Sequence, residues 1–342
     1  MEQLYYVGLD IHKRTISYCV KSYSGEITRE GKISANRTEL DQWQSSLPRP
    51  WVAAMEATLF TGWIYDHLSQ QGAKVKVADP SMLKAITASK KKNDKVDARK
   101  IADLLRCDLL PECYMAPAEI RELRRILRYR NLLVRQCVQM KNRMAGLLME
   151  TGTSYQGGRL HGKEYFQKML REWEASVPDS VIHLLGLSRS TVEVLSKMER
   201  KLLQGLLQQP LLEQRVQRLM SIGGVGPVTA LSWALETGEP QRFSRVSQAI
   251  RYCGLCSAQN SSADKEYRGP ISKKRNHHLQ CVLVEAAKLA PRWNPQLAAV
   301  HARELERGNR NRATLAVARK LVAYLLAVDK SGQPFQVRSQ AT

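Results

Sequence analysis

The spacing of apolar residues changes near residue 116, and this change divides the chain into two kinds of architecture. Strands that alternate with helices indicate an α/β domain, here residues 1–115. After Pro117, apolar residues recur at helical spacing to about Leu148, which predicts one long amphipathic helix. In the α/β part, short apolar runs predict strands at 4–9, 15–22, 26–34, 51–55 and 75–78 and helices near 40–47 and 63–70.

The rest of the chain is expected to be mostly helical. In residues 116–213, a less regular segment at 154–189 separates the long helix from a second helical stretch. Two such helices can pair as a hairpin or coiled coil, within one chain or between chains, and the sequence leaves both open. Residues 214–330 predict a mostly helical C-terminal domain, and residues 331–342 predict a disordered tail.

The charge of the chain points to a polyanionic partner. Lys and Arg number 53 against 32 Asp and Glu, which gives a formal net charge of +21. Such an excess attracts nucleic acid, although a solvated basic surface and a membrane surface are alternatives. The sequence has no run of about eighteen apolar residues, and MEQLYYVGLD lacks the regions of a signal peptide. We therefore expect a cytoplasmic protein that binds nucleic acid.

The seven cysteines are scattered and odd in number, which favours reduced thiols. Cys253 and Cys256 form a single CxxC motif, and His277 and His278 follow it, so a zinc site is conceivable. Because the chain has no second CxxC, packing of these thiols in a core is the favoured interpretation.

Four acidic residues stand where carboxylates can gather. Asp10 and Glu56 each follow an apolar strand, and Asp94 and Asp97 share one face if their segment is helical. Singly, each has an ordinary explanation as a helix cap or as the partner of a nearby basic residue. Together they would repel one another unless a cation neutralised them. Mg²⁺ suits such a set, because it prefers oxygen ligands and binds beside phosphate.

Three motifs carry a resemblance to a known family. They are GLDIHK at 8–13, AMEAT at 54–58 and KNDKVDA at 92–98, and they resemble the DEDD transposases of the insertion-sequence-110 family. The N-terminal domain of that family is similar to the Holliday-junction resolvase RuvC, a ribonuclease-H-like fold. The resemblance implies that the four acids form a catalytic tetrad that binds Mg²⁺ or Mn²⁺. It also implies that phosphate lies beside Lys91, Lys92 and Lys95.

A second motif lies in the C-terminal region. SIGGVGPVTA at 221–230 is similar to a helix-hairpin-helix DNA-binding motif, in which Gly224 and Gly226 bring backbone N–H groups to a phosphate. An ordinary turn between two helices is the alternative. The long helix begins with further basic residues that we expect to contact nucleic acid, namely Arg121, Arg124 and Arg125.

The stretch 252–279 combines serines with basic residues. It resembles the C-terminal domain of the same family, in which a catalytic serine follows a Gly-Leu pair and precedes basic residues. This resemblance implies that Ser262 is the nucleophile. Ser261 is the alternative, because Ala263 stands where the family commonly has glycine. The basic residues expected to bind nucleic acid here are Lys265, Arg268, Lys273, Lys274 and Arg275.

The resemblance spans roughly residues 1–330 and implies site-specific recombination of transposon-end and target DNA. It further implies a phosphoseryl link to DNA, a homo-oligomer that combines the acids of one subunit with the serine of another, and a bridge RNA that acts as a guide. Two other functions fit the residues alone. One is a junction-resolving nuclease that uses only carboxylates and water, and the other is a non-catalytic nucleic-acid-binding protein.

Overall fold

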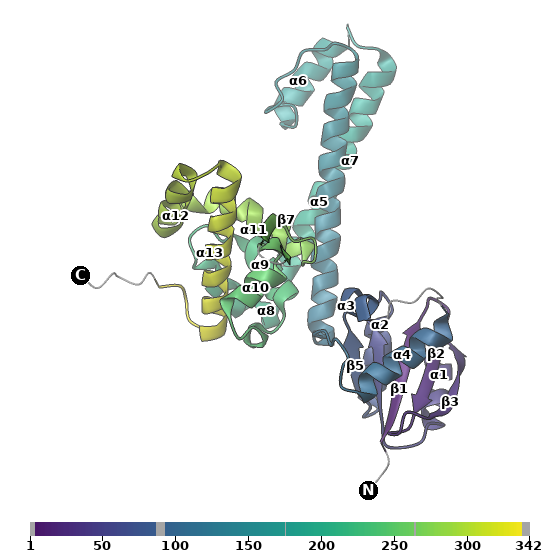
Figure 1. Ribbon diagram of the computed structural model, residues 1–342. Coiled ribbons are helices and arrows are strands. Elements are labelled where there is room, and N and C mark those ends of the chain that lie inside the picture. Colours follow the sequence, from purple (N-terminus) through teal and green to yellow (C-terminus); the bar gives the residue numbers. More distant parts are fainter. Residues whose placement is uncertain (1–3, 87–92, 175, 263–264, 337–342) are drawn as a thin grey trace, which may run out of the picture. The chain divides into compact units, whose positions relative to one another are not determined.

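Figure 1 shows the chain as a computed structural model, which describes residues 4–86, 93–174, 176–262 and 265–336. The chain divides into two compact units, Met1–Ala118 and Glu119–Thr342, and each is described by itself. The division falls where the apolar spacing changes, because each type of spacing buries a core of its own.

The first unit is built on a five-stranded sheet with the strand order β3-β2-β1-β4-β5. β2 runs antiparallel to β1 and to β3, whereas β1, β4 and β5 run parallel. This mixed sheet confirms the predicted α/β start and is consistent with a ribonuclease-H-like domain. The strands are β1 (Tyr5–Ile11), β2 (Thr15–Lys21), β3 (Ile27–Ser34), β4 (Trp51–Glu56) and β5 (Lys74–Ala78).

Alternation of side chains gives this sheet two different faces. Val7 and Leu9 of β1 are fully buried on one face, in a core that includes Leu40 of α1 and Ile64 of α2. Gly8 and the residues in phase with it lie on the other face, which α4 covers. The helices of this unit are α1 (Arg37–Ser45), α2 (Thr61–Gln70), α3 (Pro80–Ile86) and α4 (Asp94–Arg106).

Glycine at position 8 lets α4 lie directly on β1. A Cβ atom at this position would be 2.0 Å from the carbonyl oxygen of Ala98 and 2.5 Å from the backbone nitrogen of Ala102. Because no side chain fits at such distances, only glycine permits this approach of helix and strand. Ile101 packs beside this contact against Ala54 of β4. The start of α4 is thereby held over the sheet near the end of β1.

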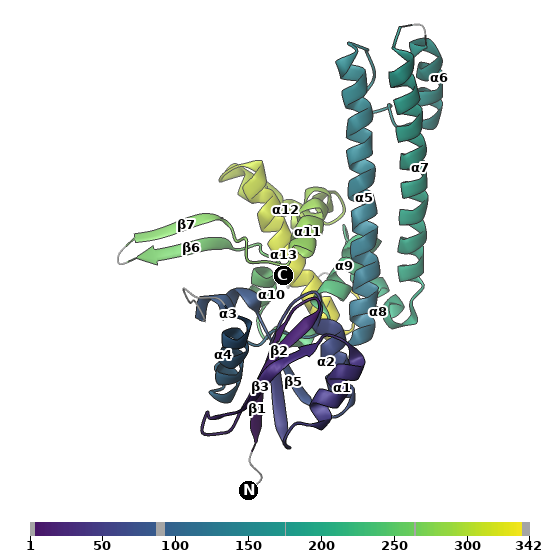
Figure 2. The same ribbon diagram turned by 90° about the vertical axis from the view of Figure 1, so that its right-hand side faces the viewer.

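Two long helices of the second unit, α5 (Ala118–Glu150) and α7 (Asp179–Leu207), form an antiparallel hairpin. They lie side by side in both views (Figures 1 and 2), and Arg130 Nε donates to Glu199 Oε1 at 2.6 Å. A third helix, α6 (Lys163–Trp173), packs at the far end of this hairpin through Phe166. Residues 154–189, whose apolar spacing is less regular, include α6 and the start of α7, which the spacing did not predict because glycines and a proline interrupt it.

The remaining helices of the second unit enclose a core around Trp233, whose side chain is fully buried. Its indole N–H donates to Asp329 at 2.8 Å, and Arg215 donates twice to the same carboxylate. These helices confirm the predicted mostly helical remainder. They are α8 (Pro210–Met220), α9 (Pro227–Thr237), η1 (Pro240–Arg242), α10 (Val246–Tyr252), α11 (His277–Leu289), η2 (Ala290–Arg292), α12 (Pro295–Glu306) and α13 (Arg310–Ser331).

The chain beyond α13 is ordered further than the sequence suggests. The Phe335 ring lies 4.8 Å from the Tyr324 ring, and the Phe335 N–H donates to Ser221 Oγ at 2.7 Å. The first part of the expected disordered tail at 331–342 therefore packs on the helices, because one aromatic side chain anchors it.

A two-stranded antiparallel sheet of β6 (Ser257–Ser262) and β7 (Lys265–Ile271) extends from the helices of the second unit (Figure 2). The sequence predicts no strand here, because SAQNSS and KEYRGPI lack the apolar alternation of a half-buried strand. A hairpin of two strands is only marginally stable by itself. The contacts at its base therefore decide where it points.

Candidate active site and nucleic-acid interface

Asp10 and Glu56 lie on the face of the sheet that α4 covers. Asp10 is inside β1 rather than after it, two residues beyond Gly8 and in phase with that glycine. Gly8 pairs with Ala54 of the parallel strand β4, and Glu56 follows Ala54 by two residues at the end of that strand. The two acids therefore stand on neighbouring strands and on the same face.

Asp94 and Asp97 are in the first turn of α4, over this face. The N-cap is Asn93, whose side chain accepts a hydrogen bond from the Lys95 N–H at 3.2 Å, so Asp94 is not the cap. Both carboxylates interact favourably with the positive end of the helix dipole, which is an ordinary reason for acids at this place. Asp97 Oδ1 also lies 4.0 Å from Lys100 Nζ.

His12 joins Asp10 and Asp94 in one group. Its Nε2 lies 3.2 Å from Asp10 Oδ2 and 3.4 Å from Asp94 Oδ1, and Lys32 Nζ lies 3.5 Å from the other Asp94 oxygen. One potential ligand atom from each of the three residues lies within 4.8 Å of the others, the one such group in the described part of the chain. His12 belongs to the GLDIHK motif, but the motif by itself predicts no role for it. Its place two residues beyond Asp10 was the available signal.

The electrostatics of Asp10 favour a bound proton or cation. Its side chain is 14% exposed. Burial raises the pKa of Asp10 above its ordinary value, His12 opposes this shift, and the negative charges of Asp94 and Asp97 add to it. A cation among these carboxylates would remove their repulsion. Asp97 thus acts on Asp10 through its charge, although Asp97 and Glu56 stand outside the group of three ligand atoms.

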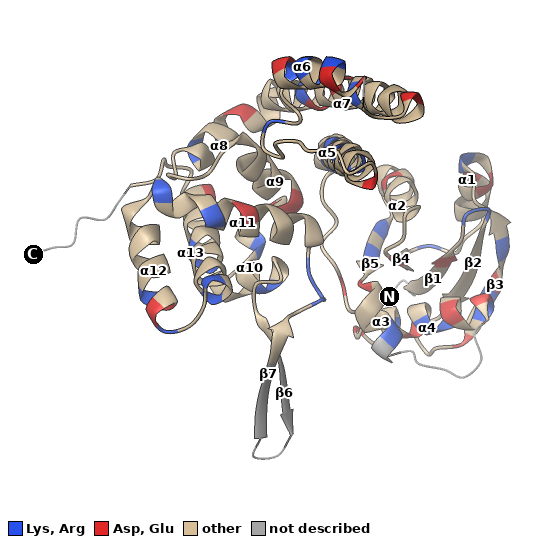
Figure 3. Cartoon of the chain, turned by 90° about the horizontal axis from the view of Figure 1, so that it is seen from above, with Lys and Arg blue, Asp and Glu red and all other residues tan. Residues whose placement is uncertain are grey.

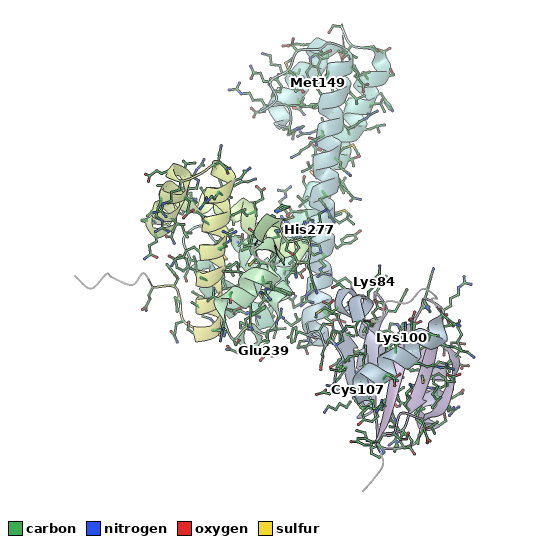
Figure 4. All side chains as sticks on the ribbon, in the orientation of Figure 1. Lys84, Lys100, Cys107, Met149, Glu239 and His277 are labelled. Atoms are coloured by element: carbon green, nitrogen blue, oxygen red, sulfur yellow. The ribbon has the colours of Figure 1, made fainter. Side chains whose placement is uncertain are left out.

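The alternative zinc site at Cys253 and Cys256 gains no support from the geometry. Cys253 is buried, and burial raises the pKa of its thiol to about 12, so the thiol stays protonated. His277, at the start of α11 (Figure 4), instead places its Nε2 3.6 Å from Cys281 Sγ. Over the described ranges, the cysteines and histidines of this region form no group of potential metal ligands.

The basic residues expected beside the acids are described only in part. Lys95 is exposed at the start of α4, whereas Lys91 and Lys92 lie outside the described residues. Figure 3 shows Lys and Arg on helices of both units. The +21 net charge is therefore spread over many elements of the chain.

The three arginines at the start of α5 differ in their surroundings. Arg124 is 19% exposed, and its Nε donates to the Leu235 carbonyl of α9 at 2.8 Å. Its guanidinium is therefore used to pack α5 on α9. Arg125 is exposed and Arg121 is partly exposed, so these two are better placed to meet a ligand.

Ser262 is the last residue of β6, where it pairs with Lys265 across the hairpin. This places the predicted nucleophile at the end of the hairpin away from the helices. The side chains of residues 258–268 lie outside the described residues, and those of Ser261 and Arg268 are among them.

The basic residues between β7 and α11 also differ in exposure. Lys273 and Lys274 are exposed. Arg275 folds back instead: its Nη1 donates to the Ser272 carbonyl at 3.0 Å, and a Cβ at Gly254 would lie 2.3 Å from its own Cβ. The two lysines are therefore more open to solvent than Arg275, which is partly buried.

The Gly-rich turn between α8 and α9 agrees with the expected helix, turn, helix order. Gly224 has φ +92°, and a Cβ there would be 2.6 Å from the Ala290 Cα, so its close approach is to the protein itself. Gly226 is the N-cap of α9 and has open space where a side chain would be. Of the two glycines, Gly226 is the one that leaves room for a phosphate.

Two family models match the chain. One, described as a transposase and named for the DEDD group of IS110, matches residues 7–152, which include all four acids. The other, described as Transposase IS116/IS110/IS902 family, matches residues 216–302, which include β6 and β7. The chain belongs to the IS110 family of transposases.

Relatives described as transposases are similar to this chain over most of their length. A transposase for insertion sequence element IS1328 from Yersinia enterocolitica is 25% identical over 338 residues, which cover 96% of this chain and 98% of the relative. A transposase for insertion sequence element IS1111A from Coxiella burnetii is 26% identical over 343 residues, or 94% and 88% of the two chains. A probable family 20 transposase from Pseudomonas aeruginosa is 24% identical and covers 84% of each chain.

These matches confirm the predicted family and its class of activity. IS110 transposases are DNA-processing enzymes that act on the ends of their element and on target DNA. The DEDD pattern also suggests use of a divalent metal, consistent with the group of Asp10, His12 and Asp94. In the described part of this IS110 transposase, no helix is long and apolar enough to cross a membrane.

Proposed function

We propose that this transposase cleaves and rejoins DNA through a covalent link to Ser262, assisted by a divalent metal at the four acids. The observation that supports this most is the place of Asp10 beneath the first turn of α4. There the ligand atoms of Asp10, His12 and Asp94 lie within 4.8 Å of one another. Merely solvated acids would not need segments distant in sequence to meet on one face of the sheet.

The residues at this site fit Mg²⁺ or Mn²⁺. Carboxylate oxygens suit both ions, and the nitrogen of His12 suits Mn²⁺ better than Mg²⁺. Burial raises the pKa of Asp10, the negative charges of Asp94 and Asp97 add to this, and a cation at the site would favour the ionised carboxylate instead. When bound, the metal would polarise the scissile phosphate and offset the charge that develops on it. The part of the protein is to hold the carboxylates in place, which the contact of α4 with Gly8 supports.

The hydroxyl of Ser262 would supply the nucleophile. It is weak by itself and needs activation by loss of its proton to a base. As the bond between Oγ and phosphorus forms, the bond between phosphorus and one DNA oxygen breaks, and that oxygen takes up a proton. The new link is again a phosphodiester, so attack by another DNA hydroxyl reverses the step and rejoins the strands. Lys273 and Lys274, exposed beyond β7, would hold the DNA phosphates nearby.

The proposal extends to the partners of the transposase. The family resemblance supports a bridge RNA that pairs with donor and target DNA, and a homodimer or tetramer that combines the acids of one subunit with the serine of another. The +21 net charge suits either nucleic acid. The hairpin of α5 and α7 offers a long surface for assembly. The exposed candidates for phosphate contacts include Lys95, Arg125 and the open turn at Gly226.

Capture of the covalent link tests the serine. With its guide RNA, the transposase should become attached to a DNA substrate nicked beside the cleavage site, since the short released strand diffuses away. The adduct is expected to appear on a denaturing gel with the wild type and to be absent with Ser262→Ala. Ser261→Ala is the matched control one residue away and should keep the adduct. Survival of the adduct in both variants would contradict a serine nucleophile at this place.

A junction-resolving nuclease is the second candidate, because the carboxylates can activate water without a serine. The cluster of Asp10, His12 and Asp94 favours it as much as it favours the transposition mechanism. Such an enzyme would release free phosphate ends without an adduct and would stay active as Ser262→Ala. The same gel therefore separates the two functions.

A further inference from the structure

A buried carboxylate joins three helices of the second unit. Glu236 of α9 is 1% exposed. Arg128 of α5 donates Nε to Oε1 and Nη2 to Oε2, both at 2.7 Å, and Asn276 Nδ2 donates to Oε2 at 2.9 Å. Burial alone would raise the pKa of Glu236, but the hydrogen bonds and charge of Arg128, with help from Asn276 and Arg124, outweigh it and lower the pKa. Glu236 is therefore ionised inside the protein.

The same group closes the base of the segment that carries Ser262. Tyr252 and Asn276 flank residues 253–275, which contain β6 and β7. The Asn276 N–H donates to the Tyr252 carbonyl at 2.9 Å, and the Tyr252 hydroxyl donates to the Glu236 carbonyl at 2.8 Å. Asn276 Nδ2 also lies 3.2 Å from the Tyr252 hydroxyl. Both ends of the segment therefore meet at Glu236.

Further bonds hold the main chain just above these ends. Gln280 Nε2 donates to the Gly254 carbonyl at 2.6 Å, and Arg319 Nε donates to the Leu255 carbonyl at 2.8 Å. The Ser272 N–H donates to the Cys256 carbonyl at 3.0 Å. Beyond this point the chain continues as the two strands, which extend from their base in Figure 2.

We propose that Arg128, Glu236 and Asn276 form a clamp that positions the serine-bearing hairpin relative to α5. They are positioning residues, because they hold the base of the segment and not the predicted nucleophile itself. The inference rests on the proposed role of Ser262. It gives α5 a fixed relation to the strand on which that serine stands.

The chemistry of the clamp suits positioning better than stability. An ion pair with a buried member gains little over apolar packing, because the buried charge loses its hydration, and here Glu236 is 1% exposed whereas Arg128 is 45% exposed. A bidentate pair of Arg and carboxylate, however, allows only a narrow range of directions. Asn276 also constrains α11, because its side-chain oxygen accepts from the Leu279 N–H and caps that helix while its Nδ2 binds Glu236. The clamp therefore holds α5, α9 and the start of α11 in fixed positions relative to one another.

Two clamp variants and one matched control test this role. Glu236→Gln weakens the pair, and Asn276→Asp keeps a good N-cap but turns a carboxylate towards Glu236. The control is Asp329→Asn, which weakens the bidentate pair of Asp329 with Arg215 in the same unit. The other hydrogen-bond partners of these two residues lie outside residues 252–276. We expect all three to lower the melting temperature by about 2–8 °C.

Hydrogen exchange and adduct formation then separate positioning from stability. At a temperature at which all variants are folded, faster exchange of backbone amides in 257–271 is expected for the clamp variants only. Their rate of covalent adduct formation should fall about tenfold or more, because small misplacements of reacting groups cost that much. DNA affinity should change less than about twofold, because both variants keep Arg128, the half-exposed positive charge of the clamp.

Two results would overturn the clamp. One is unchanged exchange in 257–271 for Glu236→Gln and Asn276→Asp. The other is an equal loss of adduct in Asp329→Asn at equal loss of stability. The exchange measurement does not depend on serine chemistry. An adduct that persists in Ser262→Ala would thus contradict the proposed function, while the exchange data would still judge the clamp.

Discussion

The acids of the first unit and the serine of the second are held by opposite kinds of structure. Asp10 lies in the central strand of a five-stranded sheet, under a helix that Gly8 admits to close contact. Ser262 ends a polar two-stranded hairpin that is fixed at its base, where Tyr252 and Asn276 meet. The first arrangement holds its residues by packing from several directions. The second sets the direction of a whole hairpin through a few buried bonds.

Of the changes that test this comparison, removal of the charge of Asp10 should have the largest effect, and it should act on strand cleavage. Asp10→Asn keeps the shape of the side chain but weakens metal binding, so we expect strand cleavage to fall by about 10²-fold or more while DNA binding is largely kept. Cleavage of labelled DNA and an affinity measurement on the same sample give both numbers. Asp108→Asn is the control in the same unit, because that carboxylate is 94% exposed. Retained cleavage in Asp10→Asn would contradict a catalytic role for this carboxylate.

A side chain at position 8 should disturb the packing of α4 on β1, which holds the acids of the first unit in place. The added Cβ of Gly8→Ala would meet the backbone of Ala98 and Ala102, so α4 has to move and the first unit should lose about 1–3 kcal/mol of stability. Thermal unfolding measures this loss, and the stabilisation by Mn²⁺ should fall with it. At Gly226, in the second unit, an added Cβ would meet open space, so Gly226→Ala should leave the stability nearly unchanged. Similar losses in both variants would show that the contact with α4 is not the cause.

Metal and pH should act together on the first unit. The pKa of Asp10 is raised in the folded chain, so the folded state binds this proton more tightly than the unfolded state, whose value is near 3.8. Ionisation of Asp10 therefore costs stability as pH rises through the folded pKa, and that cost is full above it. A metal relieves the cost, so Mn²⁺ or Mg²⁺ should raise the melting temperature more at about pH 7 than at about pH 4.5.

Differential scanning fluorimetry with and without metal, followed by excess EDTA, checks this expectation. Asp10→Asn should remove most of the dependence on metal. Equal stabilisation at both pH values, or full cleavage activity in EDTA, would argue against a metal at these carboxylates.

Loss of the lysine beside Asp94 should have the smallest effect. Lys32 and Asp94 are 3.5 Å apart, and both side chains are about half exposed. Such pairs contribute less than about 1 kcal/mol, so Lys32→Ala should leave the melting temperature almost unchanged. It should instead raise metal affinity slightly, because a competing positive charge is gone. Calorimetric titration with Mn²⁺ measures this change, and weaker binding would show that Lys32 assists the site.

The sequence predicted the first unit well, because its signals are local. Apolar runs marked the five strands, and the acids at 10 and 56 fell near the ends of two of them. The close contact at Gly8 was beyond reach, because it depends on how a helix some ninety residues later lies on the strand. The contribution of His12 was missed for a similar reason, since only the fold brings it between Asp10 and Asp94.

The second unit shows where sequence reasoning fails. The polar strands β6 and β7 bury no alternating face, so nothing in their pattern marks them. Arg124 and Glu236 look like surface charges in the sequence, yet one packs two helices and the other is buried. The role of Ser262 came from the family resemblance alone. The reason is physical: buried polar networks depend on partners far apart in the chain, which no local pattern reports.

The length of α5 determines both the distance and the direction of the far end of the hairpin relative to the clamp. Each residue of a helix adds about 1.5 Å and turns the direction of its side chains by about 100°. Removal of one residue between Arg128 and the far end near Met149 (labelled in Figure 4) would thus rotate that end relative to the clamp. Removal of about seven residues from α5, matched in α7, would shorten the hairpin by about 10 Å and nearly restore its phase. Helical phase, and not only length, thus sets the direction in which each surface of the hairpin faces from the clamp.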